Sequence, residues 1–176
     1  TSIKYGAFYD CSSLTSINIP SSVTSIGECA FYGCSSLTSI NIPSSVTSIG
    51  STTFSGCSVL TAFTVDANNP NYCADGCMLF NKEKTELVFA VGNQKTYNIP
   101  SSVTSIGESA FSYCSSLTSI NIPNSVTSIG VGAFSDCSSL TSINIPSSVT
   151  SIEQSTFYGC SSLTSINIPS SVTSIG

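Results

Sequence analysis

The stretch CSSLTSINIPSSVTSIGECAFYG, residues 11–33, decides the fold because near-copies of it fill most of the 176-residue chain. The copies keep a fixed step of 23 residues within each run. The central segment LTSINIPSSVTSIG starts at Leu14, Leu37, Leu117, Leu140 and Leu163, with Asn124 in place of a serine in one copy and Glu153 in place of the final glycine in another. A period of this length is typical of a solenoid, in which each unit forms one coil stacked on the next.

Within one unit, the apolar residues indicate two short strands and a turn. Ile17 and Ile19 alternate with polar residues, which is the period of a strand with one buried face. Pro20 ends this strand because it has no amide proton to donate to a sheet. Val23–Ile26 is a second extended piece rich in β-branched residues, and a glycine follows it. We expect residues 28–34 to form one helical or tight turn.

The L-x-x-I-x-I start of each unit is the strand signature of leucine-rich repeats. The sequence therefore predicts one leucine-rich repeat solenoid over residues 1–176, of the α/β class but mostly β. We expect a right-handed solenoid with two short parallel strands and a helical turn in each 23-residue coil. One unit, residues 60–93, has 34 residues and is called the long unit below.

The chain starts and stops at the same point of a unit, with partial units at 1–13 and 163–176. Repeat arrays ordinarily carry polar caps at their ends. We therefore expect a fragment of a longer protein, whose uncapped end coils can associate end to end. No charged-then-apolar leader opens this stretch, so we expect any targeting segment to have been removed or to lie upstream.

The composition excludes several classes of function. The chain has 7% charged residues, a net charge of −5, four lysines and no histidine or arginine. Such a surface cannot neutralise a nucleic-acid backbone. Without imidazole it has no catalytic triad or histidine metal site, so we expect no enzyme and no cofactor. No apolar run approaches the ~20 residues that cross a bilayer, so no membrane insertion is expected.

The recurring pattern C-x-x-L-x-x-I-x-I-P-x-x-V-x-x-I-x-x-x-A-F resembles the BspA-like (Treponema-type) leucine-rich repeat family. The segment NPNYCADGCMLFNKEKTELVFAV, residues 69–91, is similar to the longer variant of that family's unit, although the regular proline and valine are lost there. The resemblance covers essentially the whole chain. It implies a cell-surface or secreted protein whose partners are host matrix proteins or other cells.

The outward-facing strand residues are the first candidates for partner binding. They form two rows, with one residue per coil, on strands that lie about 4.8 Å apart. The Ser row contains Ser16, Ser39, Ala62, Thr96, Ser119, Ser142 and Ser165. The Asn row contains Asn18, Asn41, Thr64, Asn98, Asn121, Asn144 and Asn167. A wide neutral surface suits a protein or glycan partner, although the lack of aromatic residues in both rows disfavours a glycan. The alternative is that these side chains only hydrogen-bond to one another.

The long unit contains the one locally distinctive surface. Cys77–Phe80 and Glu86–Phe89 are apolar runs on either side of the polar segment Asn81–Thr85, a pattern that predicts a β-hairpin. The tip of this hairpin carries three further candidate partner-binding residues, Lys82, Glu83 and Lys84. Function often concentrates in such interruptions of a regular scaffold. The alternative is that the hairpin covers the core where the regular coil opens, with solvated charges at its tip.

Residues 66–77 superficially resemble a calcium-binding loop. Pro70 and Cys77 stand where that loop needs oxygen ligands. An Asn/Pro turn is therefore the favoured interpretation, and we expect no metal there.

Six of the nine cysteines share one phase of the repeat, which predicts a column of thiols along the solenoid. Their Cβ atoms would lie about 4.8 Å apart with parallel directions, whereas a disulfide needs a closer and converging pair. We expect these six to be reduced and buried as small apolar side chains. Cys73 and Cys77 lie outside the column and could bridge across the hairpin loop.

Two functions follow from these patterns. The first is a non-enzymatic interaction or adhesion module with a protein partner. The second is a structural spacer with no ligand of its own, which the near-identity of the units favours because a selected binding surface usually diversifies.

Overall fold

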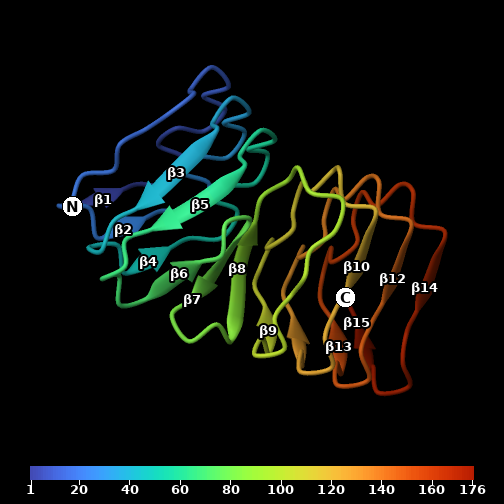
Figure 1. Cartoon of the computed structure of the whole chain (residues 1–176). Helices are drawn as coiled ribbons and strands as arrows, with labels where there is room; N and C mark the ends of the chain where they lie inside the picture. Colours follow the sequence, from blue (N-terminus) through green and yellow to red (C-terminus); the bar gives the residue numbers. More distant parts are fainter.

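The computed structural model describes all residues 1–176 and contains strands and turns but no helix. The chain is a mostly-β solenoid of about eight coils with units about 23 residues apart. Two ladders of short parallel strands run along it (Figure 1). Many strands pair in register with their counterparts one unit away, as Ser119 pairs with Ser142 and Ser142 with Ser165. Each ladder consists of more than one sheet. Since there is no helix, no element can cross a membrane as a long apolar helix.

The first strand of each unit gives one ladder and the second strand gives the other. The first-strand ladder contains β3 (Ser39–Ile42), β5 (Ala62–Val65), β10 (Ser119–Asn121), β12 (Ser142–Asn144) and β14 (Ser165–Asn167). The second-strand ladder contains β1 (Ser2–Ile3), β2 (Ser25–Ile26), β4 (Ser48–Ile49), β9 (Ser105–Ile106), β11 (Ser128–Ile129), β13 (Ser151–Ile152) and β15 (Ser174–Ile175). The long unit adds β6 (Tyr72–Ala74), β7 (Met78–Asn81) and β8 (Glu86–Ala90).

Phenylalanine rings stack through the interior within each run of regular coils. The rings of Phe8, Phe31 and Phe54 follow one another at centroid distances of 5.2 and 5.8 Å. A second stack of Phe111, Phe134 and Phe157 has distances of 5.1 and 5.9 Å. Within each stack, the planes of neighbouring rings are within 9° of parallel. The phenylalanines that share one position of the repeat therefore form two ring stacks, one on each side of the long unit.

The segment after each second strand is a run of turns, and the predicted helical turn is wrong. Alternate amides point in different directions: Phe31 N donates to Thr53 O of the next coil at 3.0 Å, whereas Tyr32 N donates to Cys29 O at 3.1 Å. Donation to the neighbouring coil is incompatible with the i→i−4 bonds of a helix. Cys29 and Gly33 also have φ of 55° and 70°, which a right-handed helix cannot contain. The fold is thus all-β rather than α/β.

These turn segments lie one above another and form what we call the turn ridge, made of residues 5–10, 28–33, 51–56, 108–113, 131–136 and 154–159. Inter-coil bonds such as Gly33 N to Ser55 O, at 2.9 Å, connect neighbouring segments. The long unit has only a two-residue turn, Gly92–Asn93, before the next coil begins. The ridge is therefore one segment short at that unit.

Threonine hydroxyls connect neighbouring coils. Thr127 donates both its amide, at 2.8 Å, and its hydroxyl, at 3.2 Å, to the carbonyl of Thr104 one unit earlier. The same double donation is made by Thr24, Thr38, Thr47, Thr61, Thr118, Thr141, Thr164 and Thr173. The high hydroxyl content of the chain thus stabilises the stack, because each bond satisfies a backbone carbonyl between coils.

The long unit divides the interior into two apolar clusters. Its strand β7 pairs antiparallel with β8, and β8 pairs parallel with β9. Leu79 and Phe89 pack in the cluster of the N-terminal coils, whereas Phe80 and Leu87 pack in the cluster of the C-terminal coils. The β7–β8 hairpin is therefore a wall that is buried on both faces. Its strands cover the core where the regular coil opens, which was the alternative to a binding role in the sequence analysis.

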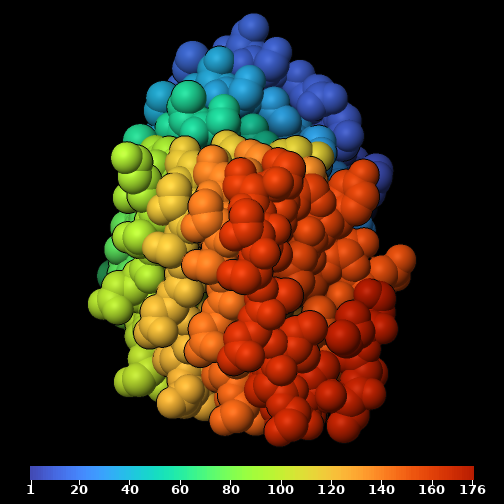
Figure 2. All heavy atoms as spheres, turned by 90° about the vertical axis from the view of Figure 1, so that its right-hand side faces the viewer, coloured from blue at the N-terminus to red at the C-terminus, as the bar shows by residue number.

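The solenoid bends at this wall. In Figure 1, β3 and β5 are inclined relative to β10, β12 and β14. Figure 2 looks at the C-terminal coil, and the N-terminal coils emerge above it instead of being hidden behind it. The two runs of coils therefore have different stacking directions.

Candidate functional site: the outer face of the first-strand ladder

The structure places the Ser row and the Asn row side by side on the outer face of the first-strand ladder. Their members are exposed except for Ala62, which is half-buried. β10, β12 and β14 bring Ser119, Ser142 and Ser165 into register, followed by the three asparagines two positions on. At the N-terminal end, Ser16 and Asn18 are exposed but lie outside any strand. Asn98 joins the ladder only through a single bridge to Asn121.

Few side-chain hydrogen bonds form within the two rows. The Thr64 hydroxyl bonds to Asn41 Oδ1 at 3.1 Å and also lies 3.1 Å from the Ile40 carbonyl. Asn167 Nδ2 donates to Asn144 Oδ1 at 3.4 Å. The other serines and amides of this face keep their donors and acceptors available to solvent or to a partner. This distinguishes them from the inter-coil threonines, whose hydroxyls are already engaged.

The face is hollowed over the last three coils of the first-strand ladder. A hollow of about 360 Å³ is lined by Ser119, Ile120, Ser142, Ile143, Asn144, Ser165, Ile166 and Asn167. It combines polar side chains of both rows with apolar atoms of the isoleucine that stands between the serine and the asparagine in each strand. Neither row contains an ionisable group. Contacts made there would rely on neutral hydrogen bonds and apolar burial, and would depend little on salt.

The charged hairpin tip borders the outer face through Lys82 and turns Glu83 toward a second hollow. Lys84 stands in the tight turn with φ of 55°, and its Nζ lies 5.8 Å from the centre of the Phe80 ring. Lys82 Nζ donates to the Ala67 carbonyl at 3.4 Å. Glu83 borders a polar hollow of about 450 Å³ together with Glu86 and residues of β4 and β6. The structure brings the tip and the two rows together at one point, because Lys82 and Thr64 of the Asn row line the same hollow of about 310 Å³.

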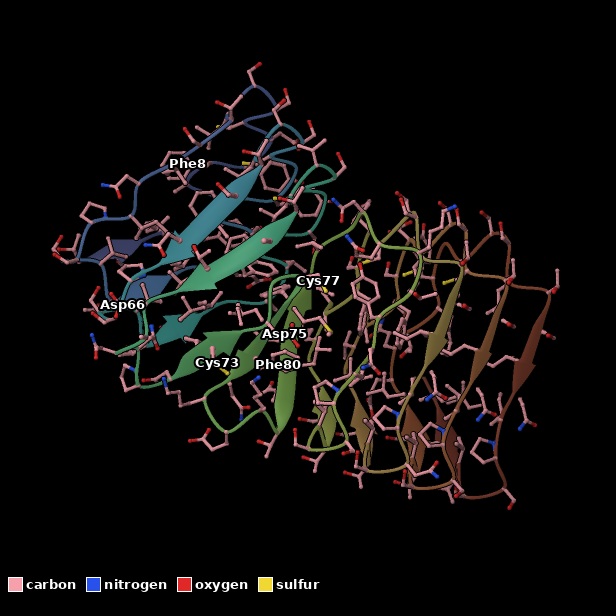
Figure 3. The ribbon with its side chains drawn as sticks, in the orientation of Figure 1. Phe8, Asp66, Cys73, Asp75, Cys77 and Phe80 are labelled. Carbon is pink, nitrogen blue, oxygen red and sulfur yellow. The ribbon has the colours of Figure 1, made fainter.

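The segment that resembled a calcium loop is a turn held by its own amides, as the Asn/Pro interpretation predicted. Buried Asn69 donates to the carbonyls of Pro43 and Val46, at 2.8 and 3.0 Å, and accepts from two amides that follow it. Asp66 Oδ1 accepts from Asn68 N at 2.8 Å. Asp66 and Cys77 lie well apart in Figure 3, so the segment does not close around one point.

All nine cysteines are free thiols. Four of the six column thiols are buried as expected, whereas Cys11 in the first coil is exposed and Cys160 is half-buried, so the expectation that all six are buried is wrong. The column is visible in the bonds that it makes, since Cys57 Sγ donates to the Phe31 carbonyl and Cys137 Sγ to the Phe111 carbonyl, both at 3.2 Å. Burial raises the pKa of Cys57 and of Cys114 to about 12. Cys73, labelled in Figure 3, donates to the Asn81 carbonyl at 3.3 Å and forms no bridge to Cys77.

Sequence reasoning missed a group of exposed tyrosines on the turn ridge. Tyr9 and Tyr32 occupy the same position of successive units, and Tyr113 lies beside Tyr32 although 81 residues separate them. A signal for the first pair was present, because the dipeptide Phe-Tyr recurs 23 residues later. Nothing in the repeat indicated the contact with Tyr113, which depends on the bend.

The chain belongs to the BspA type leucine rich repeat region family. Six copies of the family pattern match residues 1–89 and 82–176, which confirms the resemblance drawn from the repeat. No curated protein matches the chain.

Several solved bacterial proteins share this fold. A leucine rich cell surface protein from Faecalibacterium prausnitzii A2-165 has a TM-score of 0.88 and 38% identity, covering 100% of this chain and 47% of that one. The pneumococcal vaccine antigen PcpA has a TM-score of 0.79 and 26% identity, with 90% and 46% covered. A leucine-rich repeat protein from Bacteroides ovatus ATCC 8483 has a TM-score of 0.54 and 32% identity, with 87% and 37% covered. The chain thus spans less than half the length of each of these proteins.

Proposed function

We propose that the chain is a non-enzymatic module for protein interaction and adhesion, belonging to a bacterial cell-surface or secreted protein. The observation that carries the proposal is the outer face of the first-strand ladder, where exposed polar side chains have few partners within the molecule. The names of two similar proteins, a cell surface protein and a vaccine antigen, support the location. A host matrix or surface protein is the partner class that the family resemblance favours.

Contact would be made through the Ser and Asn rows over β10, β12 and β14. The hollow there gives a partner side chain apolar atoms to cover and amides and hydroxyls to bond. An individual neutral hydrogen bond contributes only about 1 kcal/mol, so useful affinity requires several coils to engage together. A repeated array supplies this, because identical donors recur at each step along the ladder.

The proposal is tested by binding to a panel of immobilised extracellular-matrix proteins, measured by biolayer interferometry. The double variant Ser142→Arg with Asn144→Arg places bulk and charge in the hollow and should weaken saturable binding more than tenfold. The control Ser128→Arg adds the same side chain to the exposed second-strand ladder and should bind as the parent chain does. The triple alanine variant at Lys82, Glu83 and Lys84 tests the hairpin tip.

A second candidate is a spacer that holds other regions of a longer protein at a fixed distance. It is favoured by the sameness of the rows, since Ser-Ile-Asn recurs unchanged in β10, β12 and β14. The same experiment separates the two functions. A chain that binds none of the panel saturably is a spacer, and binding that survives both the outer-face and the tip variants would place the contact elsewhere.

A further inference from the structure

Three tyrosines form a fixed aromatic surface on the turn ridge where the solenoid bends. The rings of Tyr9 and Tyr32 stack with centroids 4.8 Å apart, and Tyr113 meets Tyr32 edge-to-face at 5.7 Å. The hydroxyls of Tyr32 and Tyr113 are hydrogen-bonded at 2.7 Å. Tyr9 and Tyr113 are nevertheless 49% and 39% exposed. The rings are therefore held in place by one another and remain open to solvent.

The missing segment of the turn ridge brings these rings together. Tyr32 and Tyr113 belong to units three steps apart, which regular stacking would separate by about 14 Å. The long unit contributes only the short turn Gly92–Asn93, so the ridge closes over it. The backbone of Tyr113 lies directly against Gly92, where a Cβ would stand 3.2 Å from the Tyr113 carbonyl oxygen. No other place along the solenoid repeats this arrangement.

The surroundings of the tyrosines are acidic. The six segments of the ridge contain no lysine, and their charged residues are Asp10, Glu28, Glu108 and Asp136. The Asp10 carboxylate lies against Gly33, next in sequence to Tyr32, whereas the Asp136 carboxylate lies against Gly159, in the coil on the far side from Tyr113. A carboxylate therefore lies at the Tyr9–Tyr32 end of the row of rings. A complementary ligand carries positive charge and a surface that packs on aromatic rings.

We propose that this tyrosine cluster is a docking surface for an arginine-bearing segment of a partner protein. The guanidinium group is planar and weakly hydrated, so it can stack on a phenol ring while donating hydrogen bonds to a neighbouring carboxylate. A lysine ammonium is a strongly hydrated point charge and matches this surface less well. The surface is separate from the Ser and Asn rows, which contain neither rings nor charges.

The rings need little reorganisation to bind such a segment. Burial and the hydrogen bond with Tyr113 raise the pKa of Tyr32, so the Tyr32 phenol stays protonated at neutral pH and can keep its hydrogen bond to Tyr113. Preorganised side chains lose less conformational freedom on binding than free ones do.

The test uses fluorescein-labelled peptides of six Gly-Arg or six Gly-Lys repeats, titrated with the whole chain and followed by fluorescence anisotropy. The double variant Tyr9→Ala with Tyr113→Ala should bind the arginine peptide about tenfold more weakly, since an exposed cation–π contact is worth about 0.5–1 kcal/mol per ring. Tyr158→Ala is the matched control: Tyr158 occupies the same unit position as Tyr9 and is 69% exposed. Its loss should change affinity less than twofold.

Two further comparisons exclude a folding defect as the cause of weaker peptide binding. Tyr113→Phe retains the ring and should bind within about threefold of the parent chain. In the parent chain labelled at tyrosine, the ring signals of Tyr9 and Tyr113 should shift on titration while those of Tyr158 stay unchanged. Equal affinity for the arginine and lysine peptides, or arginine binding that leaves the Tyr9 and Tyr113 signals unmoved, would overturn the proposal. Both results are independent of whether the outer face binds matrix proteins.

Discussion

In the regular coils almost every contact repeats one unit later, whereas in the long unit almost none does. Phe31 stacks in parallel on Phe8 and Phe54, but Phe54 meets Phe63 and Phe89 of the long unit edge-on. The regular coils continue the stack by copying a single interface. The long unit replaces that interface with a wall that has a different apolar set on each face. The copied contacts therefore determine the length of the array, whereas the long unit determines its bend and its distinctive surface.

The largest expected effect concerns the copied interface. Phe134→Ala should lower the free energy of unfolding by about 3–5 kcal/mol, because the ring is fully buried between two stacked neighbours. Phe157→Ala, at a half-buried position with one stacked neighbour, should cost roughly half as much. Urea denaturation of both variants measures the difference. Equal losses of free energy would mean that a second stacked neighbour adds no stability, and that the regular coils are not stabilised by the interfaces between them.

The next effect concerns the wall. Leu79→Ala and Phe80→Ala should each cost about 3 kcal/mol, because both side chains are fully buried. They face opposite clusters, so hydrogen exchange should speed up in the N-terminal coils for Leu79→Ala and in the C-terminal coils for Phe80→Ala. Mass-spectrometric exchange resolves the two halves. The same pattern of exchange in both variants would show that the interior is one cluster rather than two.

A pH effect should follow from buried thiols on both sides of the wall. Burial raises the pKa of Cys57 and Cys114 to about 12, above the value of about 8.5 for an exposed thiol. Because the folded-state pKa is raised, the stabilisation is complete below pH 8.5 and is lost as pH rises toward 12. Each thiol should contribute a loss of about 1.4 kcal/mol per pH unit in that window. Denaturation of the parent and of Cys57→Ala with Cys114→Ala at pH 8 and pH 10.5 checks this. An unchanged slope in the variant would contradict it.

The smallest effects separate structural from free polar side chains. Thr127→Val removes a hydroxyl that bonds the Thr104 carbonyl and should cost about 1 kcal/mol. Asn121→Ala, on the exposed outer face, should cost less than about 0.5 kcal/mol. Thermal melts of the two variants give the comparison. A larger loss for Asn121→Ala would mean that the Asn row stabilises the stack and is not free for a partner.

The two regions also differ in how far the sequence predicts them. The strand positions and the outward rows of the regular coils follow from the alternation around Ile17 and Ile19, because one buried face fixes the register. The turn was predicted wrongly, because Ala30-Phe31 suits a helix locally while the amides of residues 29, 31 and 33 bond to the next coil. Local propensity could not anticipate bonds that exist only in the stack.

In the long unit, the strands of the hairpin follow from their apolar runs, and the wall could also have been predicted, although we did not predict it. The consecutive apolar residues Met78, Leu79 and Phe80 are all buried, which is the pattern of a strand covered on both faces. That signal was present in the sequence. The contact between Tyr32 and Tyr113 had no such signal, since it depends on the length of one turn and the bend that results.

The long unit divides a regular stack and bends it so that units three steps apart meet on the turn ridge. Tyrosine-selective labelling tests this directly, because the chain has only seven tyrosines and no tryptophan. We expect a nuclear Overhauser contact between the rings of Tyr32 and Tyr113 in the parent chain. This contact should disappear when residues 60–93 are replaced by a regular 23-residue unit, while the contact between Tyr9 and Tyr32 should remain. If the parent chain shows no contact between Tyr32 and Tyr113, or if the contact persists after the replacement, the long unit does not bring these two units together.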